Sequence, residues 1–271
     1  MLLLGNKDDR LLNNFTKSAL EVVDSDKIKI GVLSDTRPVS GHIWPEMLSE
    51  MASIHKPDVI VNGGDFTDWS LSGEYASYVE KLNTFDILSL HVIGNHDDRL
   101  FGPRHFAHYF GDWDLSIEMK HWKIIIVRNT WRFGYGFKSN QIDWLKQELD
   151  TTLKTCVFTH APIKQLFDDN LEANPNIIKK MVDDKGATVL HMADLTFFGH
   201  AHLFAHKAIN GNHYFISGGG APNLFPCKRT AYSWSINHGM MLELSSNGYL
   251  INMIRRGGDI HPEYQYVALS S

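Results

Sequence analysis

The chain has 271 residues, of which 43% are hydrophobic and 21% are charged, and this is the composition of a folded globular protein with a sizeable core. Its formal net charge of −5 disfavours indiscriminate binding to nucleic acid or to an anionic membrane, although a local basic patch remains open. The two cysteines, Cys156 and Cys227, are too few for a disulfide framework, and the N-terminal stretch MLLLGNKDDR is too short for a signal-peptide core or a membrane span. We therefore expect a cytoplasmic protein with no membrane partner.

Short apolar runs alternate with helix-like stretches along the chain. The runs predict strands at 28–33, 59–62, 87–93, 122–128, 155–159, 195–198, 213–217, 239–244 and 249–255. The last two flank an Asn-Gly pair, which is typical of a hairpin turn. Helices are predicted at 44–55, 74–86, 140–149 and 176–184, with Ser139 as the cap of the third. No internal repeat or long linker divides the chain, so we expect one domain over residues 1–271, with its sheets covered by helices on the outside.

Polar side chains follow five of the predicted strands at the point where each strand ends. They are Asp35, Asp65, the run Asn95-His96-Asp97, His160, and the pair His200 and His202. If these strands lie side by side, their oxygen and nitrogen atoms converge at one rim, where α/β proteins place their ligands. Gly63, Gly64, Gly94 and Gly199 stand among these residues, and they would allow tight turns and close approach of the backbone.

The motifs GGD, GNHDD, FTHAP and GHAH resemble the successive motifs of the calcineurin-like metallophosphoesterases. The stretch NTWRFGYGFKSNQIDWLKQEL and the glycine-rich YFISGGGAPNLF are also similar to segments of that family, so the resemblance covers roughly residues 28 to 225. It implies a four-layer α/β/β/α sandwich of two mixed β-sheets flanked by helices. It also implies hydrolysis of a phosphate monoester or diester by a metal-bound hydroxide. The oligomeric state stays open.

The resemblance also implies a centre for one or two divalent metal ions. Asp65 matches the aspartate that bridges the two metals; Asn95, His160 and His200 match ligands of one metal, and Asp35 and His202 match ligands of the other. Carboxylate and imidazole ligands without a thiolate suit manganese, iron, zinc or cobalt.

Two further residues match the family's catalytic positions. His96 matches the histidine that contacts the scissile phosphate and assists the leaving oxygen, and Asn95 also lies at the substrate. Asp97 is expected to orient the imidazole of His96.

The chain departs from the family at its first motif, where Asp35-Thr36-Arg37 replaces Asp-x-His. Arginine has no acceptor atom and cannot bind a cation, and two unit charges 4 Å apart repel by about 4 kcal/mol at an effective dielectric near 20. Three alternatives follow. Arg37 turns away while the metal survives with help from water or Asp68, or Arg37 replaces that metal as a bidentate phosphate clamp, or the site is degenerate and the protein is a non-catalytic scaffold.

An aromatic and basic loop precedes the helix predicted at 140–149. It contains Trp131, Arg132, Phe133, Tyr135 and Phe137. Such a loop can stack a nucleobase or a nucleic-acid end, or it can be a packed surface loop. The expected substrate is therefore a phosphate ester, with nucleotides and nucleic-acid ends among the candidates.

Overall fold

The computed structural model describes residues 13–21, 25–38, 41, 43–132, 134–167, 181–182, 184–227 and 233–269. The N-terminal stretch MLLLGNKDDR, Phe133, and most of the helix predicted at 176–184 lie outside these residues. Within that predicted helix, Val182 forms an isolated β-bridge with Ile163, and Asp184 begins a different helix. Among the described residues, no helix has the length and apolar character needed to cross a membrane.

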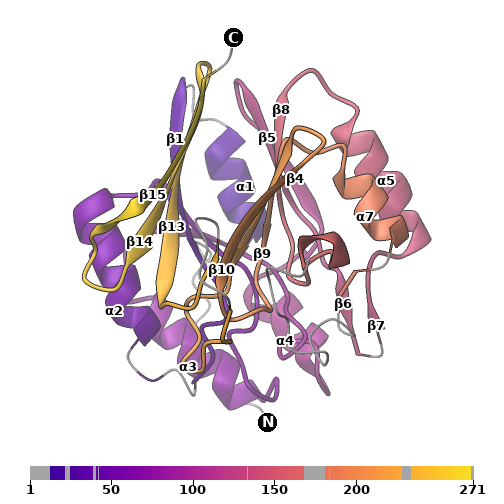
Figure 1. Cartoon of the computed structure of the whole chain (residues 1–271). Coiled ribbons are helices and arrows are strands. Elements are labelled where there is room, and N and C mark those ends of the chain that lie inside the picture. Colours follow the sequence, from indigo (N-terminus) through magenta and orange to yellow (C-terminus); the bar gives the residue numbers. More distant parts are fainter. Residues whose placement is uncertain are drawn as a thin grey trace.

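Two mixed sheets form the centre of the molecule (Figure 1). The six-stranded sheet has the order β15-β14-β13-β1-β2-β3, and the seven-stranded sheet has the order β12-β10-β11-β9-β8-β5-β4. In the first sheet, β1, β2 and β3 are parallel; in the second, β5, β8, β9 and β11 are parallel. The strands are β1 Lys27–Leu33, β2 Val59–Asn62, β3 Leu88–His91, β4 Leu115–Glu118, β5 Trp122–Ile126, β8 Lys154–Phe158, β9 Leu195–Phe198, β10 Phe204–Ile209, β11 Asn212–Ser217, β12 Ser233–Trp234, β13 His238–Ser245, β14 Gly248–Arg255 and β15 Ile260–Leu269, with a separate hairpin of β6 Thr130–Trp131 and β7 Gly134–Tyr135.

Helices cover the outer face of each sheet, which confirms the predicted four-layer α/β/β/α sandwich (Figure 1). One buried cluster lies between the sheets, where the alternate apolar residues of strands such as β1 and β5 meet. A second cluster joins one sheet to α5 and α7, and a third joins the other sheet to α2, α3 and α4. The helices are α1 Asn13–Glu21, α2 Ile43–Glu50 with the π-turn η3 Met51–His55, α3 Ser72–Leu82, α4 Gly102–Tyr109, α5 Ser139–Leu149, the 3-10 turn η4 Lys164–Leu166 and α7 Asp184–Leu190.

The predicted strands and most predicted helices are confirmed, whereas several short elements were missed. Helix α1 was not predicted; it contacts the edge strands β3 and β4 of the two sheets and so closes one side of the sandwich. Strands β4, β6, β7, β10, β12 and β15 were also missed. The predicted cap of α5 is wrong by one residue: the helix begins at Ser139, and Gln141 accepts the backbone N–H of Lys138 at 2.9 Å.

His91 is a fully buried histidine at the end of β3, and it stacks on Phe110 with ring centroids 4.0 Å apart. Neither of its ring nitrogens has a hydrogen-bond partner. Burial lowers the pKa of His91 to about 3, because the charged ring has no water around it in the folded chain. The unfolded chain therefore binds a proton that the folded chain does not, between about pH 6.5 and pH 3, and stability falls as the pH falls through this window.

We predict that His91→Leu reduces the loss of stability on going from pH 8 to pH 5 by about 2 kcal/mol, because one pKa unit corresponds to about 1.36 kcal/mol. Urea denaturation of both proteins in chelating buffer gives the free energy of unfolding at pH 8 and at pH 5, and the difference between the two values is the loss of stability. The difference at pH 8 reports the change in packing alone, since the ring is neutral in both states. Equal pH intervals for the two proteins would contradict the prediction.

Candidate active site

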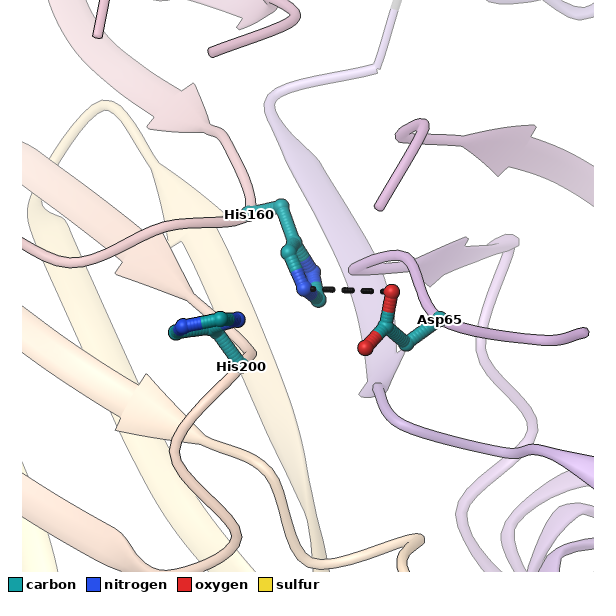
Figure 2. Close-up of side chains that lie close together, drawn as sticks. All are labelled: Asp65, His160 and His200. Carbon is teal, nitrogen blue, oxygen red and sulfur yellow. Dashed lines mark ion pairs between the residues drawn. The ribbon is translucent and has the colours of Figure 1, made fainter. Parts of the chain in front are cut away.

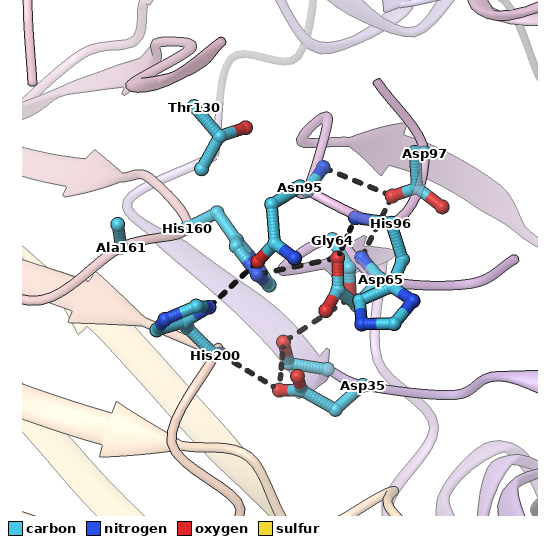
Figure 3. A network of polar contacts seen from close by, with 12 residues as sticks. Asp35, Gly64, Asp65, Asn95, His96, Asp97, Thr130, His160, Ala161 and His200 are labelled. Atoms are coloured by element: carbon cyan, nitrogen blue, oxygen red, sulfur yellow. Dashed lines mark hydrogen bonds and ion pairs between the residues drawn. The ribbon is translucent and has the colours of Figure 1, made fainter. Parts of the chain in front are cut away.

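The carboxyl ends of parallel strands from both sheets meet at one rim and bring the predicted polar residues together (Figure 3). Asp35 follows β1, Asp65 follows β2, and Asn95 comes shortly after β3 in the first sheet. His160 follows β8, and His200 follows β9 in the second sheet. Because the two sheets pack face to face, side chains that are far apart in the sequence lie close together at this rim.

Asp65, His160 and His200 form the tightest group among them (Figure 2). One ligand atom from each of these three buried residues lies within 4.8 Å of the others. Asn95 belongs to the same group, because its Oδ1 lies 2.7 Å from Nδ1 of His200. A metal with bonds of about 2.1 Å holds neighbouring ligand atoms roughly 3 Å apart. The contact between Asn95 and His200 matches this spacing, and the other ligand atoms, within 4.8 Å, lie near enough to surround one cation.

Backbone contacts prepare His160 to bind a cation. Its Nδ1 lies 2.8 Å from the carbonyl oxygen of Gly63, and that oxygen can only accept, so Nδ1 carries the proton. The other ring nitrogen, Nε2, is buried, has no hydrogen-bond partner and lies 3.4 Å from Oδ1 of Asp65. A buried nitrogen that faces only a carboxylate fits a metal ligand, because a cation bound between them would contact both atoms.

Asp35 and His202 form a second, smaller group. Nδ1 of His202 donates to the carbonyl oxygen of Asn223 at 2.8 Å, and its Nε2 lies 3.4 Å from Oδ1 of Asp35. That oxygen is buried and has no hydrogen-bond partner, whereas the other oxygen of Asp35 accepts from the Ser34 hydroxyl at 2.9 Å and from the backbone of His200 at 3.0 Å. Asp35 is thus held in place by one oxygen and presents the other toward His202.

The electrostatics of the site follow from burial and from this crowding of opposite charges. Burial opposes ionisation of Asp65, yet His160 and other neighbouring imidazoles hold the pKa of Asp65 well below its usual range. Burial likewise disfavours the charged ring of His160, but the Asp65 carboxylate raises the pKa of His160 to about 9. Burial and His160 together lower the pKa of His200 to about 3. The proton on His160 stands where a cation would, so binding of a metal ion must release it.

Arg37 points toward His96 and Asp68. Its Nη1 lies 3.5 Å from Oδ1 of Asp68 and 3.3 Å from Nε2 of His96, and its side chain is only 15% exposed. Nδ1 of His96 donates to the carbonyl oxygen of Asp68 at 2.8 Å, which leaves Nε2 as the acceptor that faces the guanidinium. In the folded chain, Arg37 thus faces His96, and Asp68, which was considered as a substitute ligand, is its ion-pair partner. The choice among the three alternatives for Arg37 stays a prediction.

The role expected for Asp97 is also wrong, because its carboxylate does not contact the imidazole of His96. Asp97 is buried and accepts hydrogen bonds from the backbone N–H groups of Asp65, Phe66, Thr67 and Gly94 and from the Thr67 hydroxyl, at 2.7–3.0 Å (Figure 3). Burial and the Asp65 carboxylate raise the pKa of Asp97 to about 7, against the effect of these donors. Asp97 thus positions Asp65 by accepting a hydrogen bond from its backbone N–H.

Three of the proposed ligands have a strained backbone. Asp35, Asp65 and His200 have φ values of 61°, 56° and 67°, in the left-handed region that costs a non-glycine residue roughly 1–2 kcal/mol. The predicted role of the glycines is confirmed where the loops cross. A Cβ atom on Gly64 would lie 2.6 Å from Nδ1 of His160, and one on Gly94 would lie 2.2 Å from Oδ1 of Asp65.

Three residues near the site escaped sequence reasoning. Asn129 accepts the backbone N–H groups of His160 and Ala161 at 3.2 and 2.9 Å and so fixes the loop after β8. The ring of Tyr135 lies 5.5 Å from that of His200, and Nη2 of Arg99 lies 3.3 Å from Nε2 of His96. Asn129 opens the stretch NTWRFGYGFKSNQIDWLKQEL and Tyr135 belongs to the aromatic loop, but neither was assigned to the metal site; Arg99 lies just after the GNHDD motif.

The aromatic loop around β6 and β7 is largely packed. The guanidinium of Arg128 lies 3.9 Å from the ring centroid of Trp131, and the ammonium of Lys138 lies 3.6 Å from it. The indole N–H of Trp131 donates to the carbonyl oxygen of Gly136 at 3.0 Å. Phe137 packs against the buried cluster beneath α5. Trp131, held by two cations, is therefore poorly placed to stack a base, and the surface-loop alternative describes this segment better.

We predict that Gly94→Ala displaces the Asp65 carboxylate, because the added Cβ would overlap both its Oδ1 and its backbone nitrogen. The variant should fold but retain less than about a tenth of the manganese that the parent retains after gel filtration, measured by elemental analysis. Gly73→Ala is the matched control, since a Cβ there meets no atom within 4 Å. Full manganese retention by Gly94→Ala would show that Asp65 does not hold the metal.

Comparisons with solved structures find the same fold in other proteins. The chain matches the purple acid phosphatase PPD1 of yellow lupin (Lupinus luteus) with a TM-score of 0.70 and 12% identity, over 88% of this chain and 53% of that one. It matches GAP50, the anchor in the inner membrane complex of Plasmodium, with a TM-score of 0.68 and 12% identity, over 91% and 90% of the two chains. A dimetal phosphatase from Danio rerio matches with a TM-score of 0.58 and 13% identity, over 83% and 95%.

These similarities show a shared fold, and the chain spans about half the length of the lupin enzyme. No curated protein matches the sequence. The family model of the calcineurin-like phosphoesterases matches residues 28–204, which include every proposed metal ligand. This match covers more than half of the chain, so the protein belongs to the calcineurin-like phosphoesterase family.

Proposed function

We propose that this protein is a metal-dependent phosphoesterase that hydrolyses a phosphate monoester or diester. The observation that carries the proposal is the meeting of Asp65, Asn95, His160 and His200, with Nε2 of His160 buried and facing only the Asp65 carboxylate, 3.4 Å away. A divalent cation bound between these atoms would replace the proton on His160 and contact both of them. The single domain and the cytoplasmic location expected from the sequence are parts of the same proposal.

The donor set fits one or two divalent cations of the manganese, iron, zinc or cobalt type, because it combines carboxylate, imidazole and amide oxygen without thiolate. When bound, such a cation polarises the phosphoryl oxygens and lowers the pKa of an attacking water. The group around His160 and His200 offers four donors. The group around Asp35 and His202 offers three if Asp65 is shared, so the first should hold its metal more tightly.

The remaining residues act on the substrate. Nδ1 of His96 is held by the carbonyl oxygen of Asp68, and Nε2 is the ring atom that we propose meets an oxygen of the substrate phosphate. Arg37 and Arg99 both point to this nitrogen, at 3.3 Å each, and a phosphate placed there would receive charge-assisted hydrogen bonds from both guanidiniums. His96 and Arg37 are thus proposed to hold the ester and to assist the leaving oxygen. Asp97 is proposed to act only by positioning Asp65.

We expect the purified chain to hydrolyse 4-nitrophenyl phosphate or bis(4-nitrophenyl) phosphate when manganese is added, and to lose this activity when a chelator removes the metal. Asp65→Asn is the matched control, because it keeps the shape of the side chain and removes the charge that the metal needs. Its rate should fall by at least 100-fold. A failure of both esters to give chelator-sensitive turnover at high protein concentration would favour a non-catalytic scaffold.

We predict that Arg37→Ala raises KM by about 10- to 100-fold, because a charge-assisted contact is worth about 1.5–3 kcal/mol and each 1.4 kcal/mol is tenfold. Its manganese content should be equal to or higher than that of the parent, since a positive charge beside the site is gone. Arg37→His should raise manganese content further by supplying a ligand, yet still show the higher KM. Parental KM values in both variants would mean that Arg37 only marks a damaged ligand position.

A further inference from the structure

Exposed apolar side chains gather on the two loops that follow Asp65 and Asn95. Trp69, Leu71, Leu100 and Phe101 are 60%, 51%, 56% and 65% exposed. Both loops border His96, so these side chains lie on the side of the site where the leaving group would depart. Large apolar side chains gathered beside a polar site mark a surface for binding, because their exposure to water is unfavourable without a ligand.

The two loops are tied into one rigid unit. The hydroxyl of Ser70 donates to the carbonyl oxygen of His96 at 2.5 Å and accepts the backbone N–H of Arg99 at 2.9 Å. The carboxylate of Glu74 accepts the backbone N–H groups of Trp69 and Leu71 at 3.0 and 2.9 Å. These bonds hold the backbone on either side of Trp69. The indole is therefore presented in a fixed place, as a preformed binding surface requires.

A single guanidinium joins Trp69 to the catalytic residues. The Cζ atom of Arg99 lies 4.8 Å from the ring centroid of Trp69, while its Nη2 lies 3.3 Å from Nε2 of His96. Its Nη1 donates to the carbonyl oxygen of Asp68 at 2.9 Å, which fixes the plane of the guanidinium. Arg99 thus orients the indole by a cation–π contact, while most of the ring stays open to solvent. In contrast, Trp131 lies against two cations.

From this arrangement we propose that Trp69 stacks the base of a nucleoside phosphate ester, whose phosphate lies between Arg37, Arg99 and the metal ligands. The inference rests on the proposed function and names its substrate class. The guanidinium of Arg99 separates the indole from His96, so the stacked ring must be joined to the phosphate through a spacer. A ribose provides such a spacer, whereas the ring of an aryl phosphate is attached directly to the ester oxygen.

The reaction then follows from the placement of the base on the His96 side. Water forms a bond to phosphorus, the bond from phosphorus to the nucleoside oxygen breaks, and the nucleoside leaves as an alcohol that has taken up one proton. Because the base lies with the leaving group, binding energy from Trp69 is available in the ground state and in the transition state. The base should therefore act mainly on KM.

The test compares adenosine 5′-monophosphate with ribose 5-phosphate, which has the same ester and sugar but no base. Both are titrated calorimetrically into the chelator-treated protein, in which hydrolysis is stopped, and both are assayed as substrates with manganese. Stacking on an aromatic side chain is worth about 1–3 kcal/mol per base, so the nucleotide should bind about 5- to 100-fold more tightly. Trp69→Ala should abolish this ratio, and Trp69→Phe should retain most of it.

Ile54→Ala is the control, because it removes an exposed apolar side chain that lies on neither of the two loops. It should keep the parental ratio. Equal binding of the two ligands, no saturable binding of either, or a ratio that survives Trp69→Ala would overturn the inference. Since the titration needs no turnover, it decides the base site even if the nitrophenyl assays show no hydrolysis. If the protein hydrolyses the nitrophenyl esters but shows no preference for the ligand with a base, the proposed function is supported and the base site is refuted.

Discussion

The buried carboxylate of Asp97 is the constraint on which the site depends. It gathers backbone N–H groups from the loop after β2 and from Gly94 after β3, and it thereby fixes the two loops that carry Asp65 and Asn95. Hydrogen bonds to a charged group are worth about 1.5–3 kcal/mol each, so together they can offset the left-handed backbone of Asp65. The proposed metal ligands on these loops are therefore held in place without a cation, which lowers the cost of binding one.

The same loops give the site two unequal sides. On the side of β8 and β9, buried imidazoles and an amide oxygen surround Asp65. Nε2 of His160 faces the Asp65 carboxylate at the place proposed for a cation. On the other side, Arg37 brings a positive charge to within 3.3 Å of His96. That charge disfavours a tightly held metal nearby and favours an anion. Arg99 places a second guanidinium at the same nitrogen, and in the proposed function both guanidiniums bind the substrate phosphate.

Aromatic residues show why exposure matters more than composition. The sequence offered the segment around Trp131 as a stacking surface because aromatic and basic residues are dense there. In the folded chain, Arg128 and Lys138 lie against the ring of Trp131. Trp69, a lone tryptophan in an unremarkable loop, remains largely exposed beside the site. Local composition does not reveal which aromatic face is covered, because the covering side chains belong to other elements.

By itself, the sequence determined the sandwich of two helix-covered sheets and the order of the residues that converge at its rim. It could do so because strand periodicity and the residue that follows each strand are local features. Only the tertiary structure decided that Asp97 holds Asp65 instead of orienting His96, and that Arg37 pairs with Asp68. It also decided that α1 joins the edges of the two sheets. Each of these contacts joins segments separated in the chain, and the packing of the sheets selects the partner from many chemically equivalent candidates.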